Sequence, residues 1–370
     1  MGIKMEQIIK ELLEETKYEL FHYPVTTKKQ DVKYIIKRMI KPKDTSKRDN
    51  FFWTHAMLTQ ALETAGDLET LRNYYDAWIE KEIPIYNVDN IMNGYSLLYV
   101  YEKTKDIKYK QAADKLYEWA CEYKKEMGNP LPYRKHHPTH VYVDGLGMIV
   151  PFLCRYGYIF GNQEAIELGV KQITDFLKYG MDEVTGLPYH GYDTKTKVKQ
   201  GIIGWGRAVG WLMLAMADSM EYLPGSEEKQ EMAEAFKRLT GNVCKYLRED
   251  GYFSWQLSAI EGPKDTSATA MIGYAIKKGI LVLENGQKEL FCAEKEEQDK
   301  KESIQLFCSD GQDNESAKII NEIKSALVNS ARNGKIYDCS GECEGFSQYP
   351  QVYGAYPWSL GSGARMLLMK

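Results

Sequence analysis

Two kinds of helical segment alternate along most of this chain. Segments of the first kind are rich in Lys and Glu and carry apolar residues at three- and four-residue spacing, which is typical of amphipathic helices with one wet face. They cover residues 4–20, 30–40, 67–81, 106–127, 162–179, 227–247 and 315–331. Segments of the second kind are poor in charge and rich in Gly, Ala, Met and aromatic residues, which predicts buried helices. They begin near residues 51, 89, 143, 205, 265 and 356.

This alternation predicts an all-α fold in which six inner helices form a closed ring inside a second ring of amphipathic helices. We expect residues 1–370 to form one such domain. Inner helices of a closed ring run in the same direction, so their first residues meet at one end. The residues that would share this opening are Asp89, Asp144, Trp205, Arg207, Asp265, Ser267 and Trp358. An open bundle or a solenoid of helix pairs uses the same alternation. It does not explain why the polar exceptions fall at the starts of the buried helices.

Asp144 is the most unusual of these residues, because the helix that it begins is otherwise apolar through residue 153 and contains two glycines near its start. A buried carboxylate is costly unless it is hydrogen-bonded or protonated, so we expect its pKa to be raised. A general acid that works near neutral pH requires such an environment. Asp is also a preferred N-cap residue. Capping is therefore the alternative interpretation, although it does not account for the glycines.

Charge and composition narrow the possible partners. The formal net charge is −4 and there is no long basic stripe, so nucleic acids and anionic membranes are poor candidates. We find no signal peptide and no apolar segment long enough to span a bilayer, and we expect a cytoplasmic protein whose seven cysteines are free thiols. The cysteines at 292, 308, 339 and 343 lack the usual spacing of zinc ligands, so no metal and no cofactor is expected. The 27 Tyr and 7 Trp suit both a core and a sugar-binding cleft.

Two stretches interrupt the alternation. Residues 185–203 form a loop with Gly, Tyr and Lys that we place at the opening, and residues 284–316 form an insertion with a charged centre at 294–302. The apolar flanks of this insertion, 290–292 and 304–308, are expected to pair as a small hairpin around a solvated tip. We expect the insertion to carry no chemistry.

Several motifs occur in an order that resembles the unsaturated uronyl hydrolases of glycoside hydrolase families 88 and 105, and more closely the unsaturated rhamnogalacturonyl hydrolases of family 105. They are residues 87–92, 143–146 with 151–153, 189–193, the group Trp205, Arg207 and Trp211, and residues 265–270. The resemblance covers about residues 51–368. It implies an (α/α)6 barrel and a metal-free hydrolase. The implied substrates are short oligosaccharides with a 4,5-unsaturated uronic acid at the non-reducing end.

The resemblance also implies a mechanism in which an acid protonates C4 of a vinyl ether, water adds at C5, and the resulting hemiketal opens to release a keto sugar. Carried over by position, Asp144 is the proton donor and then the base for water. Asp89 is the second carboxylate, which holds ring hydroxyls and raises the pKa of Asp144 by like charge. The uronate subsite that the resemblance implies contains His190, Trp205, Arg207 and Trp211.

The residue types agree with these implied roles. The planar guanidinium of Arg207 suits a uronate carboxylate, and Trp205 and Trp211 can stack on a flat unsaturated ring. Three alternatives stay open: Arg207 pairs with Asp89 instead, Trp211 is a core residue, and residues 265–267 only cap a helix.

The chain also departs from the family pattern, which often has His at the position of Tyr133, Gln at His140, Trp at Tyr142 and Asn at Val209. These positions leave open which sugar is accepted. The basic segment 134–140 contains three histidines, but Pro138 interrupts any metal geometry. We expect this loop to meet an anionic sugar, with Arg134 or His140 replacing the absent His. Aromatic residues are expected to complete the wall from two sides: Trp53 on the first inner helix, unless it only packs in the core, and Trp358 near the C-terminus.

Two further classes of function remain as alternatives at this point. One is another barrel enzyme that acts on carbohydrates, either an epimerase, which would rely on paired histidines, or an inverting hydrolase, which needs its two carboxyl groups about 6.5–9.5 Å apart. The other is a non-catalytic carbohydrate-binding protein. The residues do not indicate an oligomeric state.

Overall fold

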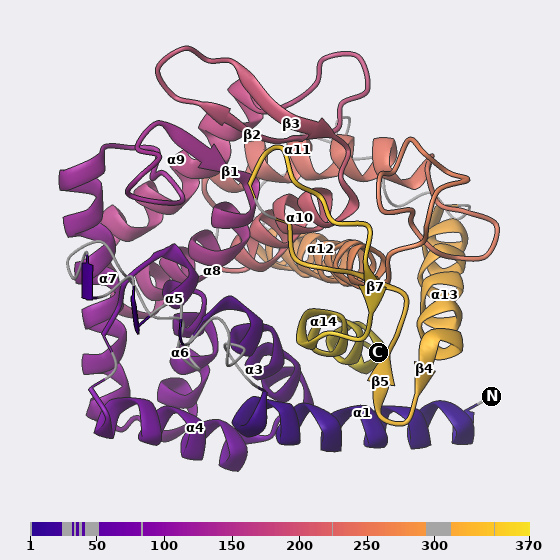
Figure 1. The fold of residues 1–370 in the computed structure, drawn as a ribbon, viewed down its shortest axis with the longest axis horizontal. Coiled ribbons are helices and arrows are strands. Elements are labelled where there is room, and N and C mark those ends of the chain that lie inside the picture. The colour runs from indigo at the N-terminus through magenta and orange to yellow at the C-terminus, as the bar shows by residue number, and fades with distance from the viewer. Residues whose placement is uncertain are drawn as a thin grey trace.

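The computed structural model describes residues 2–23, 32, 35, 36, 39, 40, 52–82, 84–223, 225–293, 312–343 and 345–370. Its inner helices match the six charge-poor segments. They are α3 (Trp53–Ala65), α6 (Asn93–Thr104) with the short α5 (Val88–Ile91) before it, α8 (Val143–Phe160), α10 (Gly206–Met220), α12 (Thr266–Ala293) and α14 (Pro357–Leu368). Each inner helix contacts the next, and α14 contacts α3 (Figure 1). The ring is therefore closed, as predicted, and the solenoid alternative is wrong.

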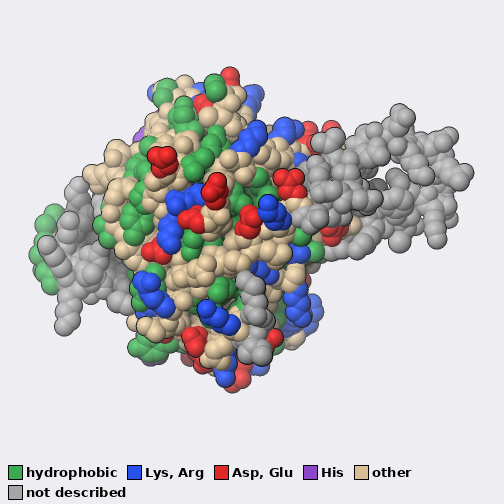
Figure 2. All heavy atoms as spheres, turned by 90° about the vertical axis from the view of Figure 1, so that its right-hand side faces the viewer, with side chains coloured by type: hydrophobic (Ala, Val, Ile, Leu, Met, Phe, Trp, Pro, Cys, Tyr) green, Lys and Arg blue, Asp and Glu red, His purple; other side chains and the backbone are tan. Residues whose placement is uncertain are grey.

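Amphipathic helices surround this ring. They are α1 (Gly2–His22), α4 (Leu68–Glu80), α7 (Ile107–Met127), α9 (Gln163–Tyr179), α11 (Glu227–Cys244) and α13 (Gln312–Ser330). The segment predicted at 30–40 lies mostly outside the described residues. On the face that carries α13, acidic and basic side chains are interspersed (Figure 2), in keeping with the nearly balanced charge of the sequence.

Short strands lie at the end of the barrel where the inner helices begin. β1 (His140–Tyr142), β2 (Tyr189–Asp193) and β3 (Lys199–Ile203) form an antiparallel sheet in that order. β4 (Ala331–Arg332) pairs with β5 (Lys335–Ile336), and β6 (Cys339–Ser340) pairs with β7 (Tyr353–Gly354). β1 runs directly into α8, and Tyr142 pairs with Gly191 of β2. This register brings the start of α8 next to His190.

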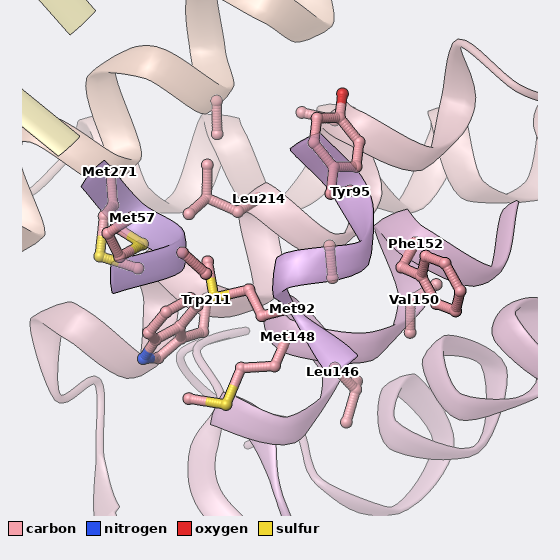
Figure 3. Packing of buried hydrophobic residues seen from close by; sticks show 14 of the residues in the cluster. Met57, Met92, Tyr95, Leu146, Met148, Val150, Phe152, Trp211, Leu214 and Met271 are labelled. Atoms are coloured by element: carbon pink, nitrogen blue, oxygen red, sulfur yellow. The ribbon is translucent and has the colours of Figure 1, made fainter. Parts of the chain in front are cut away.

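The packing of the inner ring depends on small residues at helix contacts. A Cβ atom added to Gly147 on α8 would lie 2.4 Å from the side chain of Trp211 on α10, so only glycine lets these two helices approach so closely. Trp211 lies among methionines and other apolar side chains (Figure 3). Within the described residues, α8 alone is long and apolar enough to cross a membrane, but 78% of it is buried inside the barrel. The expectation that no segment has such length and composition was therefore wrong; its burial marks α8 as a core helix.

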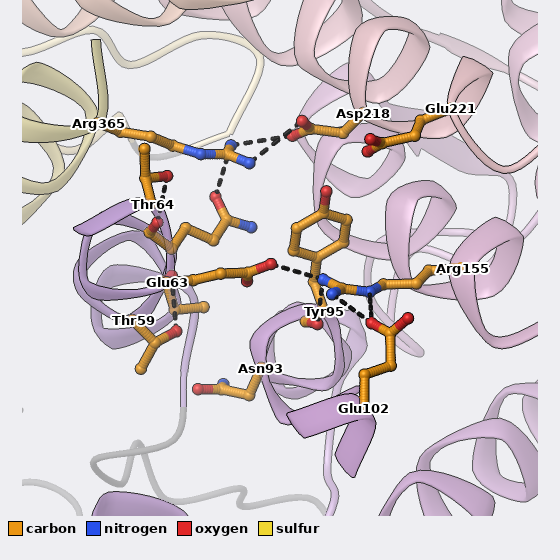
Figure 4. A network of polar contacts seen from close by, with 12 residues as sticks. Thr59, Glu63, Thr64, Asn93, Tyr95, Glu102, Arg155, Asp218, Glu221 and Arg365 are labelled. Carbon is orange, nitrogen blue, oxygen red and sulfur yellow. Dashed lines mark hydrogen bonds and ion pairs between the residues drawn. The ribbon is translucent and has the colours of Figure 1, made fainter. Parts of the chain in front are cut away.

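A polar network occupies the opposite end of the ring, which we call the base. Arg365 on α14 makes a two-pronged ion pair with Asp218, at 2.9 and 3.1 Å, and Arg155 on α8 contacts Glu63 and Glu102 at 2.7 and 2.6 Å (Figure 4). Arg155 lies eleven residues after Asp144 on the same helix, which is about 16 Å along its axis. The two ends of the ring thus carry separate groups of buried polar residues.

One element differs from the expectation. Residues 290–292, predicted to be a hairpin strand, form the last turns of α12, while the partner segment 304–308 lies outside the described residues. Leu290 and Phe291 continue the helical spacing, and no proline interrupts the chain between residues 266 and 293. The local helical pattern therefore prevails over the apolar run that suggested a strand.

Candidate active site

A cavity of about 300 Å³ lies at the end of the barrel where the inner helices begin. Its titratable and charged lining residues are Arg134, His136, His137, Asp144, His190, Arg207, Glu342 and Cys343. Its remaining walls are formed by Trp53, Tyr133, Tyr142, Met148 and Gly345. The predicted convergence of inner-helix starts therefore holds for Asp144 and Arg207.

Asp144 is the second residue of α8 and faces this cavity. The N-cap position belongs to Tyr142 and no side chain caps the helix, so the capping interpretation of Asp144 is wrong. Its Oδ2 atom lies 3.0 Å from Nε2 of His190, and the Asp144 side chain is only 12% exposed. The first turn of a helix favours negative charge, which adds to the stabilisation that His190 supplies. Asp144 is thus a nearly buried carboxylate with one oxygen bound by His190.

His190 is held from both sides. Its Nδ1 atom lies 2.7 Å from the hydroxyl of Tyr349, and its ring is 1% exposed and packs against Trp205 and Phe346. A tyrosine hydroxyl both donates and accepts hydrogen bonds, so Tyr349 supports either neutral tautomer of His190. The result is a continuous chain of hydrogen bonds from Tyr349 through His190 to Asp144.

Asp89, the second predicted carboxylate, is paired with Arg134. The guanidinium of Arg134 donates to both carboxylate oxygens at 3.0 and 2.8 Å. The alternative that Asp89 pairs with Arg207 is therefore wrong. Burial raises the pKa of the Tyr133 hydroxyl, and the charges of Asp89 and Asp144 raise it further, so both carboxylates lie near this ring. We expected Asp89 to place a like charge near Asp144. Because Arg134 neutralises Asp89, Asp144 faces an ion pair and not a bare carboxylate.

Arg207 is 2% exposed and is held by neutral groups. It donates to Ser340 Oγ at 2.8 Å, to the Ser340 carbonyl at 3.1 Å and to the Gly341 carbonyl at 2.8 Å. Asp265 accepts from Ser340 Oγ at 2.7 Å and so fixes this partner. Asp265 also accepts from the Ser267 backbone N–H at the start of α12, so it caps a helix and supports Arg207 at once. Among the described residues no carboxylate lies within ion-pair distance of Arg207.

The tryptophans lie behind the cavity wall, with one exception. Trp211 and Trp358, predicted to touch the substrate, are 1% and 4% exposed and pack in the core against Trp53. The core alternative for Trp211 is the correct one, because Gly147 draws α8 onto its ring. Trp205 is 1% exposed and is not a lining residue; the Arg207 guanidinium lies 4.6 Å from its ring centre. Trp53 is the tryptophan that lines the cavity.

His140 was predicted to contact the substrate, but it lies outside the cavity lining. Its Nε2 atom is 3.8 Å from Asp193, and its ring stacks on His137 at 5.0 Å. His140 is two residues before Tyr142 on β1, a step of about 6.6 Å along a strand, and this step carries it away from the cavity. His136 and His137 line the cavity instead. The expectation that the basic loop reaches the opening holds for Arg134 and for these two histidines.

The segment after β6 supplies site residues that the sequence did not point to. Glu342, Cys343 and Gly345 line the cavity, and Tyr349 binds His190. The available signal was a run of Gly and aromatic residues at 341–356 between two buried segments. Burial, helped by the charge of Asp144, raises the pKa of the Cys343 thiol to about 12, so this thiol is protonated at neutral pH and is no nucleophile. Its sulfur, Asp144 and His190 offer three ligand atoms within 4.8 Å of one another.

Several known proteins are similar to this chain in sequence or in fold. Residues 28–296 match Glycosyl Hydrolase Family 88. The unsaturated rhamnogalacturonyl hydrolase YesR of Bacillus subtilis is 26% identical over 247 residues, which cover 65% of this chain and 72% of that protein. A possible family 105 member from Klebsiella pneumoniae superposes with a TM-score of 0.76 at 16% identity, covering 100% of this chain and 93% of that one.

A second solved structure gives the same result for the fold. The unsaturated glucuronyl hydrolase of Bacillus sp. GL1 has a TM-score of 0.62 at 16% identity, covering 98% of this chain and 96% of its own. The ring of helices and the predicted resemblance are both confirmed, because the family match spans most of the chain. This protein is a glycosidase-like (α/α)6 barrel that belongs to Glycosyl Hydrolase Family 88.

Proposed function

We propose that this protein removes a 4,5-unsaturated uronic acid from the non-reducing end of short oligosaccharides by hydrating the vinyl ether double bond. The observation that carries this proposal is that Asp144 and Arg207 line the same cavity. Arg207 is a buried cation without a carboxylate partner among the described residues, and Asp144 is a nearly buried carboxylate with one oxygen bound by His190. The carboxylate of an anionic sugar would supply the counter-charge for Arg207.

The arrangement supports the role of Asp144 as proton donor. Protonated Asp144 would give its proton to C4 of the double bond, and the resulting carboxylate would then accept a proton from the water that adds at C5. His190 can donate through Nε2 to the carboxylate form, while the Tyr349 hydroxyl donates to Nδ1. When Asp144 is protonated, the same chain can reverse its direction. The hydrogen bond between Asp144 Oδ2 and His190 Nε2 can thus form in both the protonated and the ionised state of Asp144.

Arg207 is suited to hold the uronate carboxylate in a fixed place. Its side chain is fixed by Ser340 and Gly341, so binding an anion costs little additional side-chain ordering. The cavity volume lies at the lower end of the range for small-molecule sites, which suits a terminal sugar.

The test uses unsaturated disaccharides made by polysaccharide lyases, of both the galacturonyl and the glucuronyl series. Hydration destroys the conjugated double bond, so its ultraviolet absorbance falls with time. We expect a fall with the wild type, and no fall above background with Asp144→Asn, which keeps the size of the side chain but cannot donate the proton. Asp175→Asn, on the outer helix α9 in an ion pair with the exposed Lys171, is the matched control and should remain active. Unchanged absorbance with every disaccharide would refute the proposal.

A further inference from the structure

We propose that Asp144, His190 and Cys343 form a three-donor site for a single zinc ion in the cavity. Their carboxylate oxygen, imidazole nitrogen and thiol sulfur lie within 4.8 Å of one another. Carboxylate oxygen, imidazole nitrogen and thiolate sulfur are each ligands that zinc accepts in a tetrahedral arrangement. The inhibitory consequence described below rests on the proposed function, whereas the binding itself does not.

The geometry is close to that of a bound ion. Donors around a tetrahedral zinc are about 3.3–3.7 Å apart, because its bonds are about 2.0–2.3 Å long. Asp144 Oδ2 and His190 Nε2 are already 3.0 Å apart, so these two donors need only a slight separation. The sulfur of Cys343, on the loop that follows β6, lies within 4.8 Å of both donors, so it needs to approach by at most about 1–1.5 Å to reach the same distance. All three side chains line the cavity, which leaves the fourth position for water.

The surroundings provide a second argument, which is independent of the distances. A histidine that binds zinc usually donates its other ring N–H to a nearby acceptor, and this fixes the tautomer. Tyr349 places its hydroxyl oxygen 2.7 Å from Nδ1 of His190; in the tautomer in which Nδ1–H donates to this oxygen, the lone pair of Nε2 is available to the proposed ion. The chain thus contains the outer hydrogen bond that a zinc-binding imidazole requires.

The charges also balance. Binding releases the thiol proton of Cys343 to solvent, and a sulfur–zinc bond forms in place of the S–H bond. Zinc with one thiolate, one carboxylate and a neutral imidazole carries no net charge, which suits a nearly buried position. Arg207 and Glu342 act on the Cys343 sulfur with opposite signs, so they partly cancel. A bound zinc ion occupies the carboxylate of Asp144 that the proposed reaction requires. Zinc binding and substrate hydration should therefore exclude one another.

Binding is tested on the full-length protein with metal alone. Calorimetry with Zn²⁺ should show one equivalent bound, and Co²⁺ in its place should give a thiolate-to-cobalt absorption band. Cys343→Ser should abolish this band and weaken zinc binding by at least about 100-fold, since losing a ligand exceeds the 10–100-fold effect of losing an outer hydrogen bond. Tyr349→Phe should weaken zinc binding by about 10–100-fold and keep the band. Cys121→Ser, on the outer helix α7, is the control and should bind like the wild type.

Two further results separate the possible outcomes. Asp144→Asn removes a donor without changing the size of the side chain, so it tests the site even if Cys343→Ser does not fold. Absence of the thiolate band in the wild type, or unchanged zinc affinity in Cys343→Ser, would overturn the inference; the latter result would assign the metal to the histidines at 136–140.

Activity then tests the link to the reaction, with each protein compared with its own metal-free rate. Zinc should inhibit hydration by the wild type at concentrations that match its calorimetric affinity. Thiolate-dependent zinc binding without any hydration of unsaturated disaccharides would leave the site standing and refute the proposed function. If the protein hydrates unsaturated disaccharides and zinc neither binds to it nor slows the reaction, the proposed function stands and the zinc site is refuted.

Discussion

Asp218 and Arg365 form a buried ion pair at the base of the barrel, and removing one partner gives a quantitative test of the structure. Their side chains are 2% and 6% exposed. Asp218 also accepts from Tyr274 at 2.9 Å, and Arg365 also donates to Gln60 at 3.1 Å. Asp218→Asn keeps the shape but leaves the arginine charge buried without a counter-charge. Breaking such a pair costs about 3–5 kcal/mol.

The expected change in melting temperature follows from the size of the chain. An unfolding entropy of about 2.1 cal/mol/K per residue over 370 residues gives about 0.8 kcal/mol/K, so Asp218→Asn should lower Tm by about 4–6 °C. The exposed pair of Lys237 and Glu234, at 3.1 Å, provides the control. Glu234→Gln should cost less than about 1 kcal/mol, or roughly 1 °C.

The assay is thermal unfolding followed by circular dichroism, with activity measured below the transition. Because Asp218 lies eleven residues after Arg207 on α10, about 16 Å along the helix, the folded variant should keep its kcat. The double variant Asp218→Leu/Arg365→Met should recover most of the lost stability, since a buried pair can be replaced by apolar groups at little cost. A Tm for Asp218→Asn equal to that of Glu234→Gln would refute the reasoning.

Three further predictions concern the site, the helix packing and the response to pH. Tyr349→Phe should lower kcat by about 3- to 10-fold with little change in KM, because one hydrogen bond that orients His190 is lost; an unchanged pH–rate profile would contradict this role. Gly147→Ala should destabilise by about 1–3 kcal/mol in urea unfolding, since its Cβ would meet Trp211, whereas Gly241→Ala on α11, with open space around it, should not. Burial lowers the pKa of His55 to about 4, so the neutral form is favoured when folded. The stabilisation that neutral His55 provides is fully present above pH about 6.5 and is lost as pH falls towards 4; about 2 kcal/mol of it is lost at pH 5. In His55→Gln, the difference in unfolding free energy between pH 8 and pH 5 should lack this loss.

The fold was predictable because its pattern is local. Charge-poor helices with small residues must be buried, and this was enough to find all six inner helices and the position of Asp144 at the start of one of them. The alternation of the two helix types then predicted that the first residues of the inner helices would meet at one end of the ring. The run at 290–292 was misread, because a short apolar segment fits a strand and a helix end equally well. The segment 185–203, expected to be a loop, contains the strands β2 and β3.

The site was predictable only where a residue lies on an inner helix or on the strands beside it. Asp144, His190 and Arg207 meet at the cavity as expected, but their partners come from loops whose path no periodicity determines. Ser340 is the last residue of the two-residue strand β6, Tyr349 lies in the loop that follows it, and Arg134 reaches Asp89 from a turn. The position of Trp211 in the core depended on Gly147, which lies on the neighbouring inner helix but far away in the sequence.

The polar network at the base also determines how a sugar chain can travel. Arg155 and Arg365, with their acidic partners, are packed across the barrel axis at 4% and 5% exposure. Within the described part of the chain, the barrel is therefore closed at its base, and the cavity opens only at the other end. Under the proposed function, a long polysaccharide cannot pass through the barrel, and the released sugar leaves by the same opening through which the next oligosaccharide enters. Outgoing and incoming molecules therefore compete for one passage. Adding the product sugar at the start of an assay should slow the initial rate.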